Sequence, residues 1–283
     1  MKKLLFLFTM LLSITFFSAC DNEDDDVAKE PGTLDITFDN VAIVGGKQTQ
    51  LTMATPGSTT YDYTNEMGQK FNINLLRYYI SAIELDGPNG EHYHDHMEVK
   101  AAESKGYYLV DESNSKSQTV TLSDIPAGKY NKITFTVGVD SAGVVDGASG
   151  GVLDPANKMF WSWNSGYIAV KFEGQSDVSK GGASGESVTS DNKKGIVFHV
   201  GGWKNIPGTA FVYNNKKITL NFDDLKVEKS KTPEVHLIFD VQSMFKGTKT
   251  IDFTGNVNVH KPTDGADVAN NIAKAFAFDH VHQ

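Results

Sequence analysis

The stretch Phe71-Asn-Ile-Asn-Leu-Leu-Arg-Tyr-Tyr-Ile-Ser-Ala-Ile-Glu-Leu85 decides whether this chain is helical or built from strands. Its first five residues alternate apolar and polar side chains, which is the period of a half-buried strand. The apolar spacing of the last ten residues would also suit a helix. β-Branched and aromatic side chains are frequent in that part, and both favour strands. We therefore predict that the whole stretch is extended.

The segments around this stretch repeat the same alternation. Leu34, Ile36 and Phe38 are separated by polar residues, so they predict a strand with one buried face. A cluster of turn residues at 86–90 predicts a hairpin into residues 91–96. Further strands are predicted at Tyr107–Asp111, Thr119–Leu122, Lys132–Gly138, Gly195–Val200, Val235–Val241 and Asn256–His260, with a second hairpin formed by Phe211–Tyr213 and Ile218–Phe222 around Asn214-Asn215.

Roughly a dozen short strands at regular spacing predict an all-β fold, a β-sandwich of antiparallel strands. Gly265–Phe276 has helical spacing, so we expect one short helix near the C-terminus. A content of 40% hydrophobic residues is sufficient for a core. Neither a repeat nor a Pro-rich linker divides residues 33–283, which we therefore treat as a single domain.

The first 20 residues have the organisation of a secretory signal peptide. Lys2 and Lys3 precede a short apolar segment, and small residues then lead to Cys20. That segment is too short to span a membrane as a helix. Cys20 is the only cysteine, which excludes an intramolecular disulfide, and its position resembles the lipobox of bacterial lipoproteins. We expect an exported protein that is lipid-anchored at Cys20; an unmodified residue in a cleaved signal is the alternative.

Residues 21–32 contain a dense acidic cluster whose charges repel one another, so we expect a disordered tether. Such a cluster also resembles the surface-export signal of Bacteroidota lipoproteins, and simple solvation of a linker is the alternative. The expected location is the outer membrane, facing the cell surface, with the periplasmic face as the alternative. A net charge of -9 without a basic run argues against nucleic-acid binding.

Histidine placement is the main indication of chemistry in this sequence. The chain lacks the motifs of nucleophilic, phosphate-binding and zinc-protease sites, so we do not expect an enzyme. His92, His94 and His96 follow one another at every second position, and His280 and His282 lie at the C-terminus. Residues i and i+2 of a strand share a face, so each such pair can present two imidazoles to one metal ion.

Each of these histidines also has a structural interpretation. The site at His94 and His96 follows a polar turn, where imidazoles are often merely solvated. The C-terminal pair could belong to a frayed end, although Phe276 and Phe278 just before it indicate docking. His199 lies between apolar neighbours of a predicted strand, where a lone histidine is more often a hydrogen-bonded core residue. Two further histidines are interpreted as structural: His236 and His260.

Trp161 and Trp163 are one residue apart in the block Met159-Phe-Trp-Ser-Trp-Asn-Ser-Gly-Tyr167. On a strand they would stand side by side. One interpretation is a large core anchor, and the other is an aromatic pair that takes part in chemistry. The block alone leaves both open.

Five segments together resemble the MbnP-like copper-binding proteins, in the Bacteroidota lipoprotein branch of that family. They occur in the family's order over nearly the whole mature chain, and the Trp-x-Trp block is the most specific. The segments are Leu76–Ser81, Val137–Asp140, the block at Met159–Tyr167 with Lys171–Gly174, Phe198–Gly201 and Asp279–His282.

The resemblance implies copper binding or copper handling without catalysis. It implies His199, His280 and His282 as the ligands. In relatives from methane-oxidising bacteria, a tryptophan that is oxidised to kynurenine by a partner di-haem enzyme also contributes to the site. Trp163 or Trp161 would be the oxidised residue here.

Two other functions stay open on the sequence alone. Trp161, Trp163 and Tyr167 could form an exposed aromatic platform that binds glycans or proteins at the cell surface. The chain could also be a structural accessory without a metal. Burial of the tryptophans distinguishes the first of these functions from copper binding.

Overall fold

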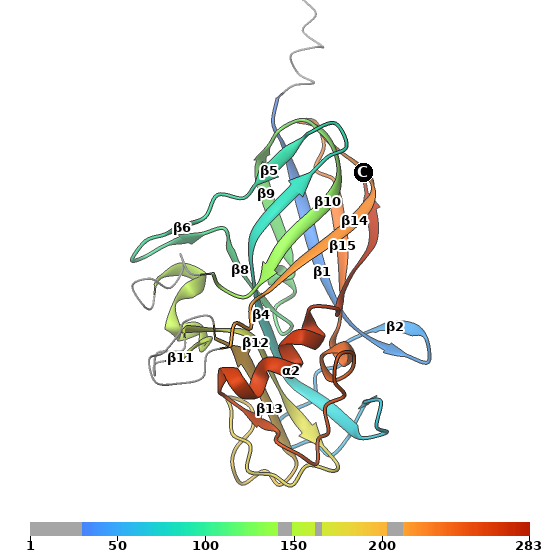
Figure 1. The fold of residues 1–283 in the computed structure, drawn as a ribbon, viewed down its shortest axis with the longest axis vertical. Coiled ribbons are helices and arrows are strands. Elements are labelled where there is room, and N and C mark those ends of the chain that lie inside the picture. The colour runs from blue at the N-terminus through green and yellow to red at the C-terminus, as the bar shows by residue number, and fades with distance from the viewer. Residues whose placement is uncertain (1–29, 141–148, 162–165, 203–211) are drawn as a thin grey trace, which may run out of the picture.

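The computed structural model describes residues 30–140, 149–161, 166–202 and 212–283. Two large sheets and one small one account for every strand in these ranges. Figure 1 shows the long strands of the two large sheets running mostly along the long axis of the molecule, with the only α-helix of the described residues lying across them.

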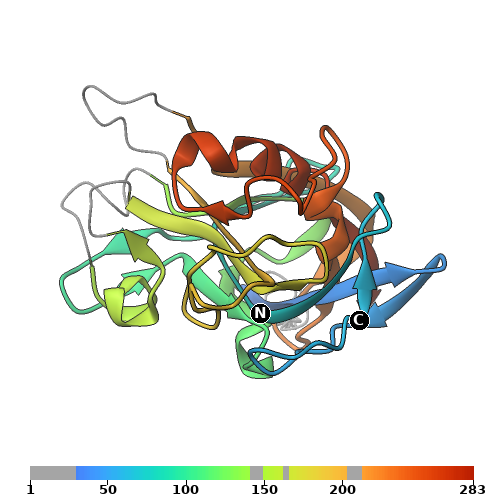
Figure 2. The ribbon, with the colours of Figure 1, turned by 90° about the horizontal axis from the view of Figure 1, so that it is seen from below.

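The first sheet has five strands in the order β17-β15-β1-β2, with β9 also paired to β1. Strand β1 pairs in parallel with β15 and antiparallel with β2 and β9. The β1–β2 hairpin extends away from the body in both views of the ribbon (Figures 1 and 2). The bounds are β1 Gly32–Val44, β2 Lys47–Gln50, β9 Thr119–Ile125, β15 Glu234–Asp240 and β17 Phe276–His282.

The second sheet has ten strands and is organised around the 17-residue strand β4. Its main order is β14-β10-β4-β12-β13-β16, and β3, β5, β8 and β11 pair along its sides. A separate hairpin joins β6 and β7. The bounds are β3 Tyr63–Thr64, β4 Lys70–Asp86, β5 His92–His94, β6 Glu98–Val99, β7 Ser104–Lys105, β8 Tyr107–Asp111, β10 Gly128–Val137, β11 Phe160–Trp161, β12 Gly166–Ser176, β13 Gly195–Gly201, β14 Lys216–Val227 and β16 Asn258–Val259.

Helix α2 spans Pro262–Ile272 and packs against β13 and the 3-10 helix η5. Pro262 suits the first turn because its missing N–H is not needed there, and Asp264 complements the positive end of the helix dipole. The part of the chain that the structure describes has no helix long and apolar enough to cross a membrane. The 3-10 helices are η1 Ser115–Ser117, η3 Gly151–Leu153, η4 Pro155–Asn157 and η5 Val241–Phe245.

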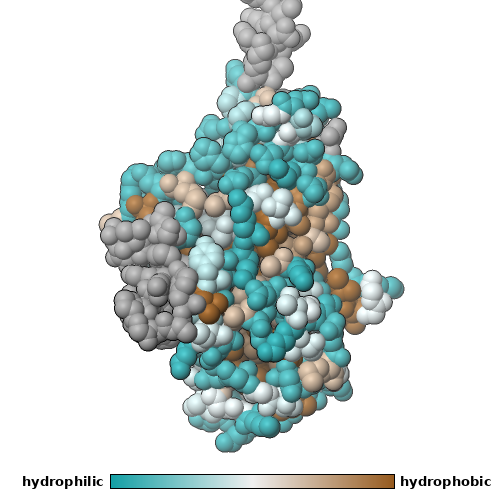
Figure 3. Space-filling view, viewed as in Figure 1, coloured by the Kyte–Doolittle hydropathy of each residue, from teal (hydrophilic) through white to brown (hydrophobic). Residues whose placement is uncertain are grey.

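Aromatic rings fill the space between the two large sheets. Phe276 of β17 stacks on Phe239 of β15 at a centroid distance of 4.5 Å, and both rings contact Tyr78 of β4 edge-on. All three side chains are buried. Hydrophobic burial is the dominant favourable term in folding, so these contacts hold the C-terminal strand on the core. Figure 3 shows that the outer surface of the face in view is largely hydrophilic.

The predicted fold class is confirmed: the chain is an all-β sandwich with one short helix near its C-terminus. The stretch at 71–85 is strand, within β4, and the hairpin after it pairs β4 with β5. The helix begins earlier than predicted and ends at Ile272, because the residues from Phe276 onward belong to β17.

Two details of the prediction were wrong. The β1–β15 and β13–β16 pairs are parallel, because these strands meet only after the chain has passed through other elements. The hairpin around Asn214-Asn215 is absent from the described residues, in which Val212 and Tyr213 are not strand. Buried Asn214 instead donates to the Gly201 and Pro262 carbonyls, and Asn215 to the Val139 carbonyl; Phe211 lies outside the described residues.

Candidate metal centre

Pairing of β15 with β17 brings three histidines together at an edge of the five-stranded sheet. His236 lies directly opposite His280, and Glu234 lies opposite His282. The register shifts next to this pair, so that Leu237 pairs with Phe278 and Asp279 forms a bulge. One nitrogen from each histidine lies within 4.8 Å of the others. We call His236, His280 and His282 the three-histidine cluster.

The ring spacings of the three-histidine cluster are close to those of ligands of one ion, and His280 must turn out of its stacked position on His236 to share that ion. The centroid distances are 4.3 Å for His236–His280, 5.2 Å for His236–His282 and 4.7 Å for His280–His282. An ion about 2 Å from an imidazole nitrogen lies roughly 3.2 Å from the ring centroid, so rings that share it at about 90–110° have centroids roughly 4.5–5.2 Å apart. The Nε2 atoms of His280 and His282 are already only 3.0 Å apart.

Carboxylates surround these rings and fix their orientation. Asp39 lies 2.7 Å from Nδ1 of His236, and Asp279 lies 2.8 Å from Nδ1 of His280. A neutral imidazole that donates through Nδ1 keeps the lone pair of Nε2 for a metal, and such partners are usual behind metal-binding histidines.

Glu234 adds a third negative charge on the other side of the cluster. Its Oε1 lies 3.3 Å from Nε2 of His236. The Thr37 hydroxyl donates to the same oxygen and, together with the nearby His236 and His282, lowers the pKa of Glu234. A neutral His236 ring has a single N–H and cannot donate to both Asp39 and Glu234, so the contact with Glu234 calls for either a second proton or a metal ion at Nε2.

The three-histidine cluster is accessible from outside. His236 is half-buried, whereas His280 and His282 are exposed. A groove of about 550 Å³ is lined by His236 and His280 together with residues 39–41 and 48–51, Glu112, Ser115 and Gln118. An ion could therefore enter and leave without opening the core.

The structure places His199 elsewhere, in β13 of the other large sheet. Its side chain is 7% exposed, and its Nε2 lies 2.8 Å from Oε1 of fully buried Glu173. His260 packs edge-on against it at a centroid distance of 4.5 Å. Burial lowers the pKa of His199, although Glu173 acts in the opposite direction. Among the described residues, His199 does not lie with His280 and His282 as predicted; His236 does.

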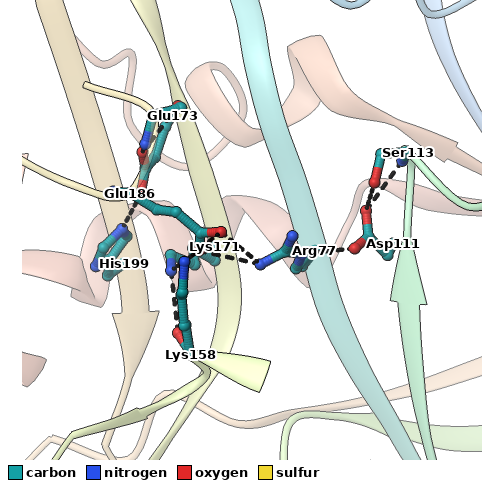
Figure 4. Close-up of polar contacts among 9 residues, drawn as sticks. Arg77, Asp111, Ser113, Lys158, Lys171, Glu173, Glu186 and His199 are labelled. Atoms are coloured by element: carbon teal, nitrogen blue, oxygen red, sulfur yellow. Dashed lines mark hydrogen bonds and ion pairs between the residues drawn. The ribbon is translucent and has the colours of Figure 1, made fainter. Parts of the chain in front are cut away.

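Glu173 is part of a polar network that crosses the outer face of the second sheet (Figure 4). Burial alone would raise its pKa, but His199 and the backbone N–H groups of Glu186 and Ser187 donate to it and lower its pKa to about 2. Glu186 continues the network by accepting from buried Lys171 at 2.9 Å and from Arg77 at 3.0 Å. Arg77, Lys158 and Lys171 each pair with a carboxylate of this network, and Glu173 is satisfied by hydrogen bonds, so we interpret these contacts as structural.

A family model described as MbnP matches residues 31–262. The chain belongs to the MbnP family. Among solved structures it is similar to "MbnP from Methylosinus trichosporium", at 18% sequence identity and a TM-score of 0.48, with 81% of this chain and 83% of that chain covered. A search of curated proteins gives no match.

Two of the three aromatic residues that could have formed an exposed platform are buried in this MbnP-family chain. Trp161 is 2% exposed and Tyr167 is 1% exposed. Both belong to a second, smaller core with Tyr79 and Met159, where large apolar rings are shielded from water. Buried rings cannot stack on a glycan, so Trp161 and Tyr167 do not supply the alternative aromatic platform. Trp163 lies outside the described residues, as does Cys20.

The sequence interpretation missed His236, which it treated as structural. A signal for it was present, because His236 stands between Val235 and Leu237, both buried. Alternation therefore turns its ring to the outer face of the strand. Its partner on that face depends on which strand lies beside β15, and this pairing is not visible in local sequence. The remaining predicted ligands, His94 and His96, are exposed near β5.

Proposed function

We propose that this chain binds copper through the three-histidine cluster and catalyses no reaction itself. The observation that carries the proposal is the convergence of one nitrogen from each ring within 4.8 Å, beside three carboxylates. Imidazole suits copper, zinc and nickel, and the resemblance to copper-binding relatives favours copper among them. A bound copper ion would be held by His236, His280 and His282, with Asp39 and Asp279 orienting the rings.

Export and anchoring form the second part of the proposal. The signal-like first 20 residues and the position of Cys20 support an outer-membrane lipoprotein, held by acyl chains on that cysteine and facing the cell surface. The protein would then bind copper outside the cell and retain or pass on the ion. Incorporation of labelled fatty acid into the chain, and its loss in Cys20→Ala, tests the anchor.

Oxidation of a tryptophan by a di-haem partner enzyme is the third part, and it rests on the family resemblance alone. Trp163 is our candidate, since Trp161 is buried in the second core. Intact-mass measurement of the protein from its native host tests it, because an oxidised side chain changes the mass. An unmodified mass would remove the tryptophan from the proposed site.

Copper titration of purified protein tests the site directly. We expect His280→Ala/His282→Ala and His236→Ala each to weaken copper binding at least about tenfold, because fewer imidazoles remain to hold the ion. His260→Ala, a half-buried histidine of the other sheet, is the matched control and should bind normally. The Cu(II) electron paramagnetic resonance spectrum should lose nitrogen couplings in the cluster variants.

The same titration separates this site from the one implied by the resemblance. His199→Ala should keep the wild-type copper affinity, because His199 contacts Glu173 rather than the cluster. Affinity should also fall as the solution is acidified, since imidazole must be neutral to bind a metal. Normal binding in the His280/His282 double variant, or its loss in His199→Ala, would refute the proposed cluster.

A further inference from the structure

A second set of histidines lies on β5, in the other large sheet from the three-histidine cluster. Strand β5 pairs with β4, placing His92 opposite Asp86 and His94 opposite Glu84. Both imidazoles are exposed, whereas Tyr93 between them is half-buried against the core. Alternation along the strand therefore turns both rings to one solvent-facing side.

A carboxylate holds Nδ1 of the His92 ring, as carboxylates hold Nδ1 of His236 and His280. Its Nδ1 lies 2.8 Å from Oδ1 of Asp86, and the other oxygen of Asp86 lies 3.0 Å from Nζ of Lys132. Donation through Nδ1 leaves Nε2 of His92 with a free lone pair in the neutral ring.

The spacing of the two rings permits a shared ion. The centroids of His92 and His94 are 6.2 Å apart, with 28° between the ring planes. Two imidazoles on opposite sides of one ion have centroids at most roughly 6.4 Å apart when each metal–nitrogen bond is about 2 Å. The two rings stack nearly parallel, so the exposed His94 side chain must adopt another rotamer to direct a nitrogen at an ion held by His92. The carboxylate of Glu84 stands on the same face, opposite His94.

Solvent access to this face is open. His92 and His94 line a hollow of about 710 Å³ with residues 104–108 and 121–124. Asp86 and Glu84 are paired with Lys132 and Lys217 on this face, so the two imidazoles rather than net charge would have to hold a cation. His96 also lines the hollow, but the ring that His94 contacts is that of His92.

We propose that His92 and His94 form a second transition-metal site, with Asp86 positioning the His92 ring. Two imidazoles suit Cu²⁺, Ni²⁺ or Zn²⁺, and water would complete the coordination. Having one imidazole fewer than the three-histidine cluster, this site binds the ion more weakly and fills second. It does not depend on the function proposed for the first site.

Titration with Cu²⁺ alone, followed by calorimetry and electron paramagnetic resonance, tests the second site. The variant His236→Ala/His280→Ala/His282→Ala removes the first site and should still bind one ion per chain. Adding His92→Ala/His94→Ala to that variant should abolish this binding. Adding Asp86→Asn instead should weaken it about tenfold, as loss of a carboxylate behind a histidine ligand usually does. Adding His96→Ala is the matched control and should change nothing.

The outcomes for the two sites are distinguishable. A triple variant that binds no Cu²⁺, or that keeps its ion after loss of His92 and His94, overturns the second site. A wild-type protein whose binding disappears with His92 and His94 alone supports the second site and refutes the first. Both histidines are exposed, so we expect every variant to fold; His94→Asn, with a circular dichroism check, repeats the test with a polar replacement.

Discussion

Glu173→Ala should be among the most destabilising single substitutions in this protein. Its carboxylate is fully buried and accepts from Nε2 of His199, the backbone N–H groups of Glu186 and Ser187, and the Ser187 hydroxyl. Gly185 lies so close that a Cβ there would approach the carboxyl oxygens to 2.4 Å. The loop at 185–187 is thus wrapped around this one group.

Alanine at 173 would leave these donors without an acceptor. Four donors, one buried and three half-buried, lose their partner, and each buried donor without a partner costs about 1–3 kcal/mol. We therefore expect a loss of about 3–5 kcal/mol in the free energy of unfolding. Glu173→Gln should lose less, about 1–3 kcal/mol, because its amide oxygen can still accept while its NH₂ group faces donors.

Urea denaturation at pH 7, followed by circular dichroism, measures this loss. Glu103→Ala is the matched control, because Glu103 is exposed and its contact with Lys105 is long, at 3.7 Å. Surface pairs contribute about 0–1 kcal/mol, so the control should stay near wild type. A loss below about 1 kcal/mol for Glu173→Ala would show that the network around Glu173 does not stabilise the fold.

Two further predictions concern the same sheet. Folding lowers the pKa values of both Glu173 and His199. The stability that His199 contributes is therefore complete above about pH 6.5 and falls below it, and the stability that Glu173 contributes is lost as the pH falls from about 4.5 toward 2. The stability difference between wild type and Glu173→Ala/His199→Ala should therefore shrink between pH 7 and pH 3; a constant difference would contradict it. Gly174→Ala should destabilise by about 3 kcal/mol or more, because its Cβ would lie 2.0 Å from the Asn72 carbonyl oxygen; a near-normal urea midpoint would refute that.

The parts of the fold that follow from local alternation could be predicted from sequence. Leu34, Ile36 and Phe38 are fully buried, as their spacing in β1 indicates. The stretch at 71–85 is strand, as its β-branched and aromatic content indicates. Local periodicity identifies the buried face of a strand, but it carries no information about the strand beside it. The parallel neighbour of β1, which is β15, was therefore missed.

The same limit explains what happened to the candidate site. His280 and His282 were chosen as a pair, and the structure keeps them together with 3.0 Å between their Nε2 atoms. His236 joins them only through the register of β15 with β17, and His199 is excluded because β13 lies in the other sheet. For Trp161 the interpretation as a core anchor applies, because its ring is buried in the second core.

The bulge at Asp279 decides which way the last histidines point. Phe276, Phe278, His280 and His282 occupy alternate positions, so an unbroken strand would turn all four to one face. Phe276 and Phe278 pack on the core, which would direct both imidazoles inward too. The extra residue at Asp279 reverses the alternation: Val281 now packs on the core, and both histidines face outward beside His236. The bulge residue also supplies the carboxylate that holds Nδ1 of His280, so one insertion both exposes the ligands and orients one of them.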